Sequence, residues 1–308
     1  MSSTAKDSTK VSRRRAFSKA DRTTLGAFVG IPLFFHLLLV WIPAVLTILL
    51  SFTYWSGISI SRIKWAGLAN YQNIFFDTPA FWEGLKNNVI WLLMFLLAPI
   101  IGLALALFLN QKIPEMRIIK VVFFVPLVLA HVIIGVVFAW FYDPTFGLLA
   151  LLTKAMGFTP IAILSNEHFV TFGIIVAALW AQVAFCLVLF LAGLSQIDHE
   201  LVAAGRLDGA KGWRLFRYVV LPQLHSVTFV AAIITVIMSL RNFDMISVMT
   251  QGGPYGRSTV LSYQMYDATI FSYRAGYGAA IATVLFAIMS IYIGWFLWHT
   301  LSAEKRTR

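Results

Sequence analysis

The sequence predicts an all-α integral membrane protein with six transmembrane helices and both termini in the cytoplasm. Three observations support this fold class: the composition, six long apolar runs, and the distribution of Lys and Arg between those runs. Of the 308 residues, 59% are hydrophobic and 12% are charged, and the mean hydropathy is +0.81. Soluble domains are about 25% charged. Despite the net charge of +11, no nucleic-acid partner is expected, because the cations lie between apolar runs.

Six apolar runs are long enough to span a bilayer, which takes about 20 helical residues for ~30 Å of hydrocarbon. They should all be helices, since an open strand edge would leave backbone groups unpaired in lipid. The runs cover about residues 25–52, 89–109, 118–142, 169–194, 224–249 and 277–301. Residues 1–22 form a polar, basic cytoplasmic tail that is expected to be disordered. The membrane domain therefore covers residues 23–308.

The orientation follows from the positions of the cations. With the N-terminus inside, 17 of the 24 Lys and Arg residues fall in cytoplasmic segments, and one more, Arg241, lies in a span. Six remain outside: Arg62, Lys64, Lys86, Lys154, Arg257 and Arg274. Cytoplasmic loops carry the excess of Lys and Arg in membrane proteins. Both termini are therefore expected in the cytoplasm, together with the polar segment 198–222 between spans four and five.

The first part of segment 198–222 is expected to be a helix with one close-approach face. Glu200, Ala203, Ala204 and Leu207 recur at helical spacing and share that face. Small side chains there would let another surface come close. Asp208-Gly209 is expected to end the helix, with Asp208 as the N-cap of a second helix.

The second part of this segment is amphipathic. Its two sides are apolar and cationic, with Trp213, Phe216 and Val220 opposite Lys211, Arg214 and Arg217. This pattern is typical of a helix lying on anionic headgroups. A docking site for a cytoplasmic protein is the other interpretation. It also explains the alanine face, which a lipid surface does not require.

The same segment resembles the cytoplasmic loop of ABC importer membrane subunits, which follows the pattern Glu-Ala-Ala, three residues, Gly, nine residues and an aliphatic-x-Leu-Pro ending. Ala204-Gly205 stand for the two alanines, Gly209 is the spaced glycine, and Val219–Pro222 reads VVLP. Residues 208–210 read DGA, as is usual in the carbohydrate branch. The family's Glu position is Ala203 here, which is a departure from the pattern.

The resemblance extends over nearly all of residues 25–305. Residues 67–75 (GLANYQNIF), 123–149 and 242–280 resemble the corresponding loops and spans of sugar permeases of the maltose or glycerol-phosphate type. It implies the type I ABC importer transmembrane-domain fold and a location in a bacterial or archaeal plasma membrane. The implied partners are a second homologous permease, two cytoplasmic ATPase subunits, an extracytoplasmic binding (lipo)protein and a sugar substrate.

The resemblance also assigns roles to residues. It implies that a short coupling helix in segment 198–222 docks on the ATPase, so this segment is called the coupling segment below. The residues expected to couple to the ATPase are Ala203, Ala204, Gly205, Asp208, Gly209 and Ala210. No catalytic residue, metal or cofactor is expected in this chain, because ATP and Mg would be bound by the ATPase subunits. The chain has no Walker-type glycine loop.

Polar residues at membrane depth are the candidates for the substrate pathway. Thr235, Ser239 and Asn242 recur at spacings of four and three and so line one helical face. Hydroxyl and amide groups beside aromatic rings suit a sugar. Aligned on the DGA and GGP sequences, the family's sugar pocket maps to Gln182, Phe185, Thr235, Met238, Ser239 and Asn242. For Thr235 and Ser239, ordinary interhelical packing is the equal alternative.

Two alternatives remain at this point. For Arg241 and Asp244, three residues apart, a structural ion pair is favoured over a role as ligand clamp. For the whole chain, the alternative is a secondary transporter driven by an ion gradient. Such a transporter needs a buried carboxylate within a span, and Asp244 is the only candidate. No Ser/His/Asp, Cys/His or metal-ligand constellation supports an enzyme.

Overall fold

The computed structural model describes residues 19–111 and 116–307. The chain divides into two compact units, with the boundary between Ile48 and Leu49. The predicted disordered tail lies outside the described residues up to residue 18. Residues 19–22, the last four of the predicted tail, are helical, because the first helix begins at Lys19.

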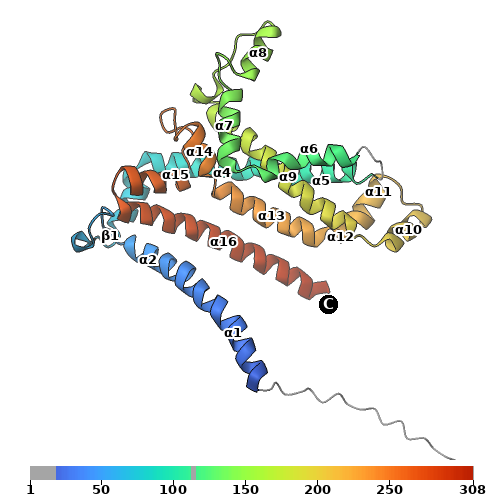
Figure 1. Cartoon of the computed structure of the whole chain (residues 1–308), viewed down its shortest axis with the longest axis horizontal. Coiled ribbons are helices and arrows are strands. Elements are labelled where there is room, and N and C mark those ends of the chain that lie inside the picture. Colours follow the sequence, from blue (N-terminus) through green and yellow to red (C-terminus); the bar gives the residue numbers. More distant parts are fainter. Residues whose placement is uncertain (1–18, 112–115, 308) are drawn as a thin grey trace, which may run out of the picture. The chain divides into compact units, whose positions relative to one another are not determined.

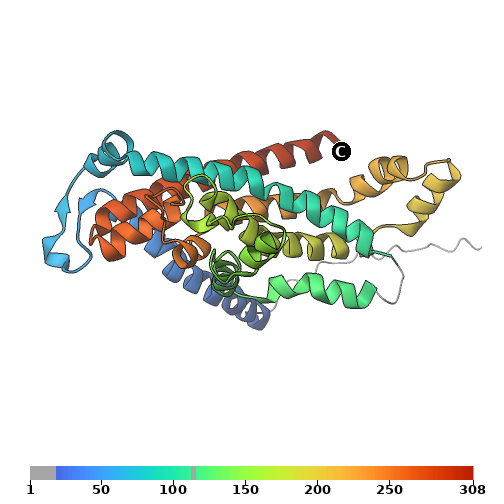
Figure 2. The same ribbon diagram turned by 90° about the horizontal axis from the view of Figure 1, so that it is seen from above.

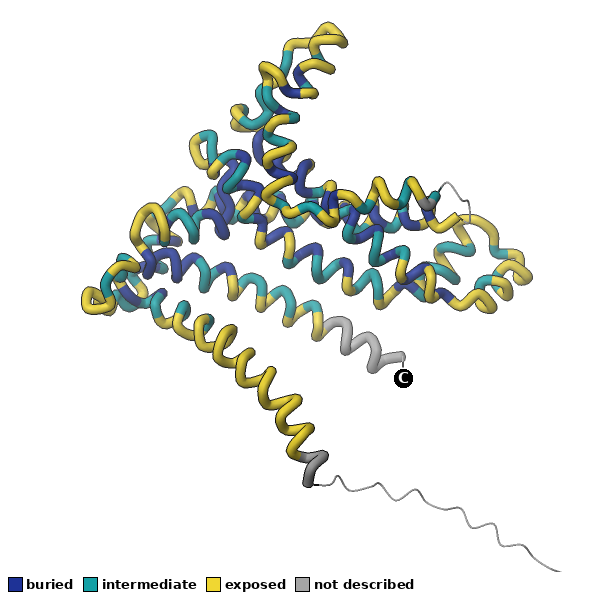
Figure 3. Tube along the Cα trace, viewed as in Figure 1, coloured by how far each residue is buried: buried dark blue, intermediate teal, exposed yellow. Residues whose placement is uncertain are grey.

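The first unit is a single apolar helix. It comprises α1 (Lys19–His36), a π-helical turn (Leu37–Trp41) and the start of α2 (Ile42–Leu50). A span of 28 residues from Thr23 to Leu50 is apolar enough to cross a membrane, and none of its most apolar window is buried within the protein. Most of its residues are exposed (Figure 3), as is typical of a helix whose apolar surface faces hydrocarbon or other helices.

The second unit holds the remaining spans, which run roughly along one direction in Figures 1 and 2. Four stretches qualify by length and hydropathy: Pro79–Leu109, Val170–Ser195, His225–Met249 and Ala275–Trp298. They are built from α4 (Pro79–Phe95), α5 (Leu97–Leu109), α9 (Val170–Ser195), α13 (His225–Leu240), α14 (Asp244–Met249) and α16 (Ala275–Thr307).

The third predicted span is not one straight helix. It consists of α6 (Met116–Val128) and α7 (His131–Phe141), and the two are bent by 103°. Pro126 lies near the end of α6, where its missing N–H weakens the helix. Ala130 then takes extended backbone before α7 begins. The described chain therefore has five candidate spans, or six if the bent pair counts as one.

The core of the second unit forms around α9, which is the most buried span (Figure 3). It packs against α5, α6, α7 and α13. The contact with α5 is close because Gly102 has no side chain. A Cβ there would lie 2.6 Å from the Cβ of Cys186 and 3.0 Å from the Cys186 carbonyl carbon. Small residues of this kind let helix backbones approach in membranes.

Short elements connect the spans. Before α4 lie β1 (Thr53–Tyr54), a 3₁₀ turn (Ile60–Arg62), β2 (Lys64–Trp65), α3 (Ala69–Gln72) and a π-helical turn (Asn73–Asp77). The strands pair antiparallel, with Thr53 opposite Trp65, and form one small sheet beside the helices. After α7 come α8 (Leu148–Ala155) and a 3₁₀ turn (Ile163–Ser165). Between α14 and α16 lie α15 (Leu261–Tyr266) and the π-helical turn η6 (Asp267–Phe271).

The coupling segment forms α10 (His199–Leu207), α11 (Trp213–Leu215), the π-helical turn η5 (Phe216–Val220) and α12 (Leu221–Gln223). In Figures 1 and 2 it projects from one end of the second unit, whereas β1 and α15 lie at the other end. The helices thus separate two polar regions, which suits a protein whose two ends face opposite sides of a membrane.

Candidate functional site

The coupling segment is a helical hairpin with well-defined caps. Asp198 is the N-cap of α10, and its carboxylate accepts a hydrogen bond from the Glu200 N–H at 2.8 Å. Asp208 is the C-cap of α10, and the second helix begins instead after Gly212. The prediction that Asp208 would be the N-cap of that helix is wrong. Gly209 follows with φ of +85°, the left-handed conformation that ends helices and favours glycine.

The two parts of the hairpin pack on each other through Gly205. A Cβ at this position would lie 2.9 Å from Val219 and 3.3 Å from Leu215. The Ala210 N–H donates to the Gly205 carbonyl at 3.0 Å, which closes the turn. Gln223 holds the base, because it accepts from the Asp198 N–H at 3.0 Å. Gly205 and Ala210 therefore lie on the inside of the hairpin.

The predicted close-approach face of α10 is exposed. Ala203, Ala204 and Asp208 are exposed, and Leu207 has 89% of its surface accessible. A leucine side chain this exposed at a helix end packs against almost nothing in its own chain. On the second part, Trp213 is 72% exposed and packs on Phe216 with ring centroids 5.2 Å apart. The hairpin thus offers an apolar tip next to a cationic, aromatic flank.

The predicted pathway residues divide into two groups. The first group is buried and hydrogen-bonded between α9 and α13. Gln182 donates to the Thr235 hydroxyl at 2.9 Å, and the Cys186 thiol lies 3.7 Å from the same oxygen. Ser239 is fully buried, and its hydroxyl donates to the Val236 carbonyl. Phe185 packs partly buried in the core around Cys186. These polar groups are satisfied by their own chain.

The second group faces open space. Met238 and Asn242 line a cavity of about 190 Å³ together with His131, Arg241, Asp244 and Met245. Met238 is 37% exposed, and Asn242 is nearly buried and donates to the Ser239 carbonyl. Arg241 and Asp244 are both within the described residues and form no ion pair there, so the structural ion pair favoured from sequence is wrong. Both charged side chains remain available at the cavity.

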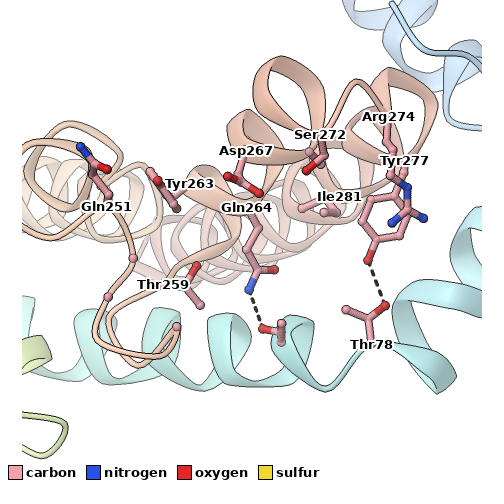
Figure 4. Close-up of a pocket in the computed structure, with 15 residues that line it drawn as sticks. Thr78, Gln251, Thr259, Tyr263, Gln264, Asp267, Ser272, Arg274, Tyr277 and Ile281 are labelled. Atoms are coloured by element: carbon pink, nitrogen blue, oxygen red, sulfur yellow. Dashed lines mark hydrogen bonds between the residues drawn. The ribbon is translucent and has the colours of Figure 1, made fainter.

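A larger cavity of about 410 Å³ lies between the loop after α14, α15, η6 and the start of α16 and α4 (Figure 4). Gln251, Asp267, Ser272 and Arg274 line it, and none of them was a predicted site residue. Tyr263 packs in the protein core at one wall. Its burial, followed by the nearby Asp267 and Tyr266, raises the pKa of Tyr263 above its usual value.

No group of three or more His, Cys, Asp or Glu side chains that could hold a metal ion occurs within residues 19–111 and 116–307. The chemistry of the described sites is that of neutral hydrogen-bonding groups, isolated charges and aromatic rings.

Comparison with known proteins identifies the family. Residues 8–303 match the family described as binding-protein-dependent transport system inner membrane component. The chain belongs to this family. A probable ABC transporter permease protein of Pyrococcus horikoshii is 32% identical over 283 residues, which is 91% of this chain and 94% of that protein. The sulfoquinovosyl glycerol transport system permease protein of Agrobacterium fabrum is 31% identical over 226 residues, 73% of each chain.

The permease also resembles a solved structure. The bacterial ABC transporter involved in import of the acidic polysaccharide alginate contains a chain with a TM-score of 0.79 and 18% identity, covering 94% of this chain and 98% of that one. This likeness confirms the fold expected from the sequence, the type I ABC importer transmembrane-domain fold. The protein is therefore a non-catalytic, multi-pass inner-membrane permease of a binding-protein-dependent ABC importer. This assignment decides against a secondary transporter driven by an ion gradient.

Proposed function

We propose that this permease forms half of the translocation pathway for a sugar or related glycoside. An extracytoplasmic binding protein delivers the substrate, and two cytoplasmic ATPase subunits drive transport through the coupling segment. A second, homologous permease supplies the other half. The observation that carries the proposal is the exposed tip of α10, where Ala203, Ala204 and Leu207 present an apolar surface that no described residue covers.

The geometry of the tip supports protein docking over lipid binding. Leu207 and the small residues beside it lie next to the Asp208 carboxylate, which an anionic headgroup would repel. Arg206 lies in the last turn of α10, but the other cations lie on the second part of the hairpin, where Arg214 and Arg217 are exposed near Trp213. The hairpin can thus rest its cationic flank on headgroups while its tip fits into a cleft of an ATPase subunit.

The carbohydrate assignment draws on two kinds of support. One is the similarity to the sulfoquinovosyl glycerol permease and to the alginate transporter, both named for sugar-containing substrates. The other is the polar lining at the C-terminal end of α13, where Met238 and Asn242 border the 190 Å³ cavity. We assign Asn242, Met238, Arg241 and Asp244 to the wall of the pathway. Gln182, Thr235 and Ser239 are assigned to the hydrogen-bonded layer behind it, with Phe185 packed nearby.

The orientation with both termini in the cytoplasm is part of the same proposal. It places the coupling segment inside, where ATP is available, and the loop after α14 outside, where the binding protein is. The opposite ends that these two regions occupy in Figures 1 and 2 agree with it. Cysteine accessibility of Ala204→Cys and Ser61→Cys from the two sides of sealed cells or vesicles tests this orientation directly.

Co-purification from the native membrane tests the proposed function. Detergent-solubilised permease is expected to retain an ATPase subunit, and Ala204→Glu, which places a charge on the exposed tip, should release it and abolish uptake. Lys154→Gln, on the exposed surface of α8, is the matched control and should leave both unchanged. Retention of the ATPase by Ala204→Glu, with normal uptake, would contradict the coupling role.

A further inference from the structure

The cavity of about 410 Å³ beside α15 is lined by polar side chains that have no partner in the described chain (Figure 4). Gln251, Asp267 and Ser272 form no side-chain hydrogen bond or ion pair there. Arg274 stacks its guanidinium 4.3 Å from the ring centroid of Tyr277 and contacts no carboxylate. Converging polar groups without partners are typical of a binding site, because a ligand can satisfy them.

Three polar side chains at or beside the wall are already hydrogen-bonded, and they hold the segments around the cavity together. Gln264 donates to the Ala80 carbonyl, and Tyr277 donates to the Thr78 hydroxyl at 3.2 Å (Figure 4). Asn87 donates to the Thr259 carbonyl at 2.8 Å and so ties the loop to α4. The cavity is thus formed by a hydrogen-bonded frame, and no closing movement is needed to assemble it.

The backbone also holds one of the free side chains in an uncommon conformation. Gln251 has φ of +50°, which side chains other than glycine rarely adopt. Such conformations persist where the surroundings determine them, and they concentrate at binding sites. Gln251 thus lines the cavity from a backbone position that its surroundings determine.

The mixture of charges selects the class of ligand. An anion would meet the Asp267 carboxylate, and a cation would meet Arg274, so neither is favoured. A neutral ligand with many hydroxyl groups can donate to Asp267, accept from Arg274, and do both with Gln251 and Ser272. The buried ring of Tyr263 contributes an apolar edge to the wall. The volume suits a disaccharide-sized ligand.

We propose that this cavity is a second saccharide-binding site, separate from the pathway residues on α9 and α13. The proposal rests on the sugar transport and orientation proposed above, which place the segment between Met249 and Ala275 at the extracytoplasmic mouth. A sugar leaving the binding protein would be held here before it enters the membrane pathway.

Equilibrium binding to the full-length permease in nanodiscs tests the site, with maltose, trehalose and raffinose as labelled probes. At least one probe should bind. Asp267→Asn, which keeps the side-chain shape, should raise its Kd at least fivefold. Gln251→Gly should also raise Kd at least fivefold. It adds no backbone strain, since glycine adopts positive φ readily. Lys154→Gln on α8 is the control and should change Kd less than twofold, and thermal unfolding should confirm that every variant is folded.

Three results would overturn the site. One is the absence of binding for all three probes. Another is sugar binding that Met238→Ala weakens but neither cavity substitution does. That result would leave the transmembrane pathway as the only sugar site, with the proposed function intact. The third is loss of binding-protein capture by the cavity variants without any sugar binding, which would make the cavity a protein-docking site. Whether the permease retains the ATPase subunit, as tested under the proposed function, does not depend on any of these three results.

Discussion

Leu207 gives a quantitative test of docking, because its side chain contributes almost nothing to the free chain. With 89% of its surface exposed, nearly all of its apolar surface is available to a partner. Leu207→Ala removes three carbon atoms, and at about 0.8 kcal/mol per buried CH₂ this loses about 2 kcal/mol of docking free energy. A loss of that size weakens Kd by about 30-fold. The free energy of unfolding of the permease itself should change by less than about 0.5 kcal/mol, as is usual at exposed positions.

The assay is titration of the purified ATPase subunit onto nanodisc-embedded permease, read by biolayer interferometry. Leu201→Ala is the matched control, because Leu201 is also an exposed leucine of α10, at 53%. It points about 100° away from the centre of the face that holds Ala203, Ala204 and Leu207. Unchanged affinity for Leu207→Ala, or an equal loss for Leu201→Ala, would refute the assignment of this face to the ATPase.

The remaining predictions concern three other positions. Ala203→Glu, which restores the family's usual residue on an exposed position, should leave uptake within about twofold, and a transport-dead variant would show that the site excludes charge. At Gly209, which has a φ of +85°, the substitution Gly209→Ala should destabilise the end of the helix by about 1 kcal/mol. Gly209→Asn should destabilise it less. Thermal unfolding and ATPase capture of the two variants check this order. Gly102→Val should destabilise the membrane domain by about 2 kcal/mol or more, because its Cβ would lie 2.6 Å from Cys186; an unchanged unfolding temperature would contradict the close contact of α5 with α9.

The sequence was sufficient for the fold class because its signals are local. Apolar runs of span length and cations between them depend on composition alone, and the family pattern around Gly209 depends on spacing along one segment. The face shared by Ala203, Ala204 and Leu207 was likewise predictable from helical periodicity, and the structure leaves that face exposed. The bend between α6 and α7 was missed because a proline in a span does not by itself determine how far the helix turns.

The site was harder to predict because it depends on contacts between distant segments. The hydrogen bond from Gln182 to Thr235 joins residues 53 positions apart, and nothing in either helix reveals its partner. The missing ion pair between Arg241 and Asp244 has a similar cause. Their spacing permits a pair, but α13 ends at Leu240 and α14 begins at Asp244, so they do not share one continuous helix. The cavity around Asp267 and Arg274 draws on several segments and leaves no periodic signal.

Site-directed cross-linking at the tip of α10 tests the central claim most directly. Cys186 is the only native cysteine and is buried, so Ala204→Cys introduces a single accessible thiol. In native membranes, a short thiol-reactive cross-linker should join this position to an ATPase subunit and block ATP-driven uptake. Ser61→Cys, between β1 and β2, should give no such product. Absence of an ATPase adduct at Ala204→Cys in an active transporter would contradict coupling through this segment.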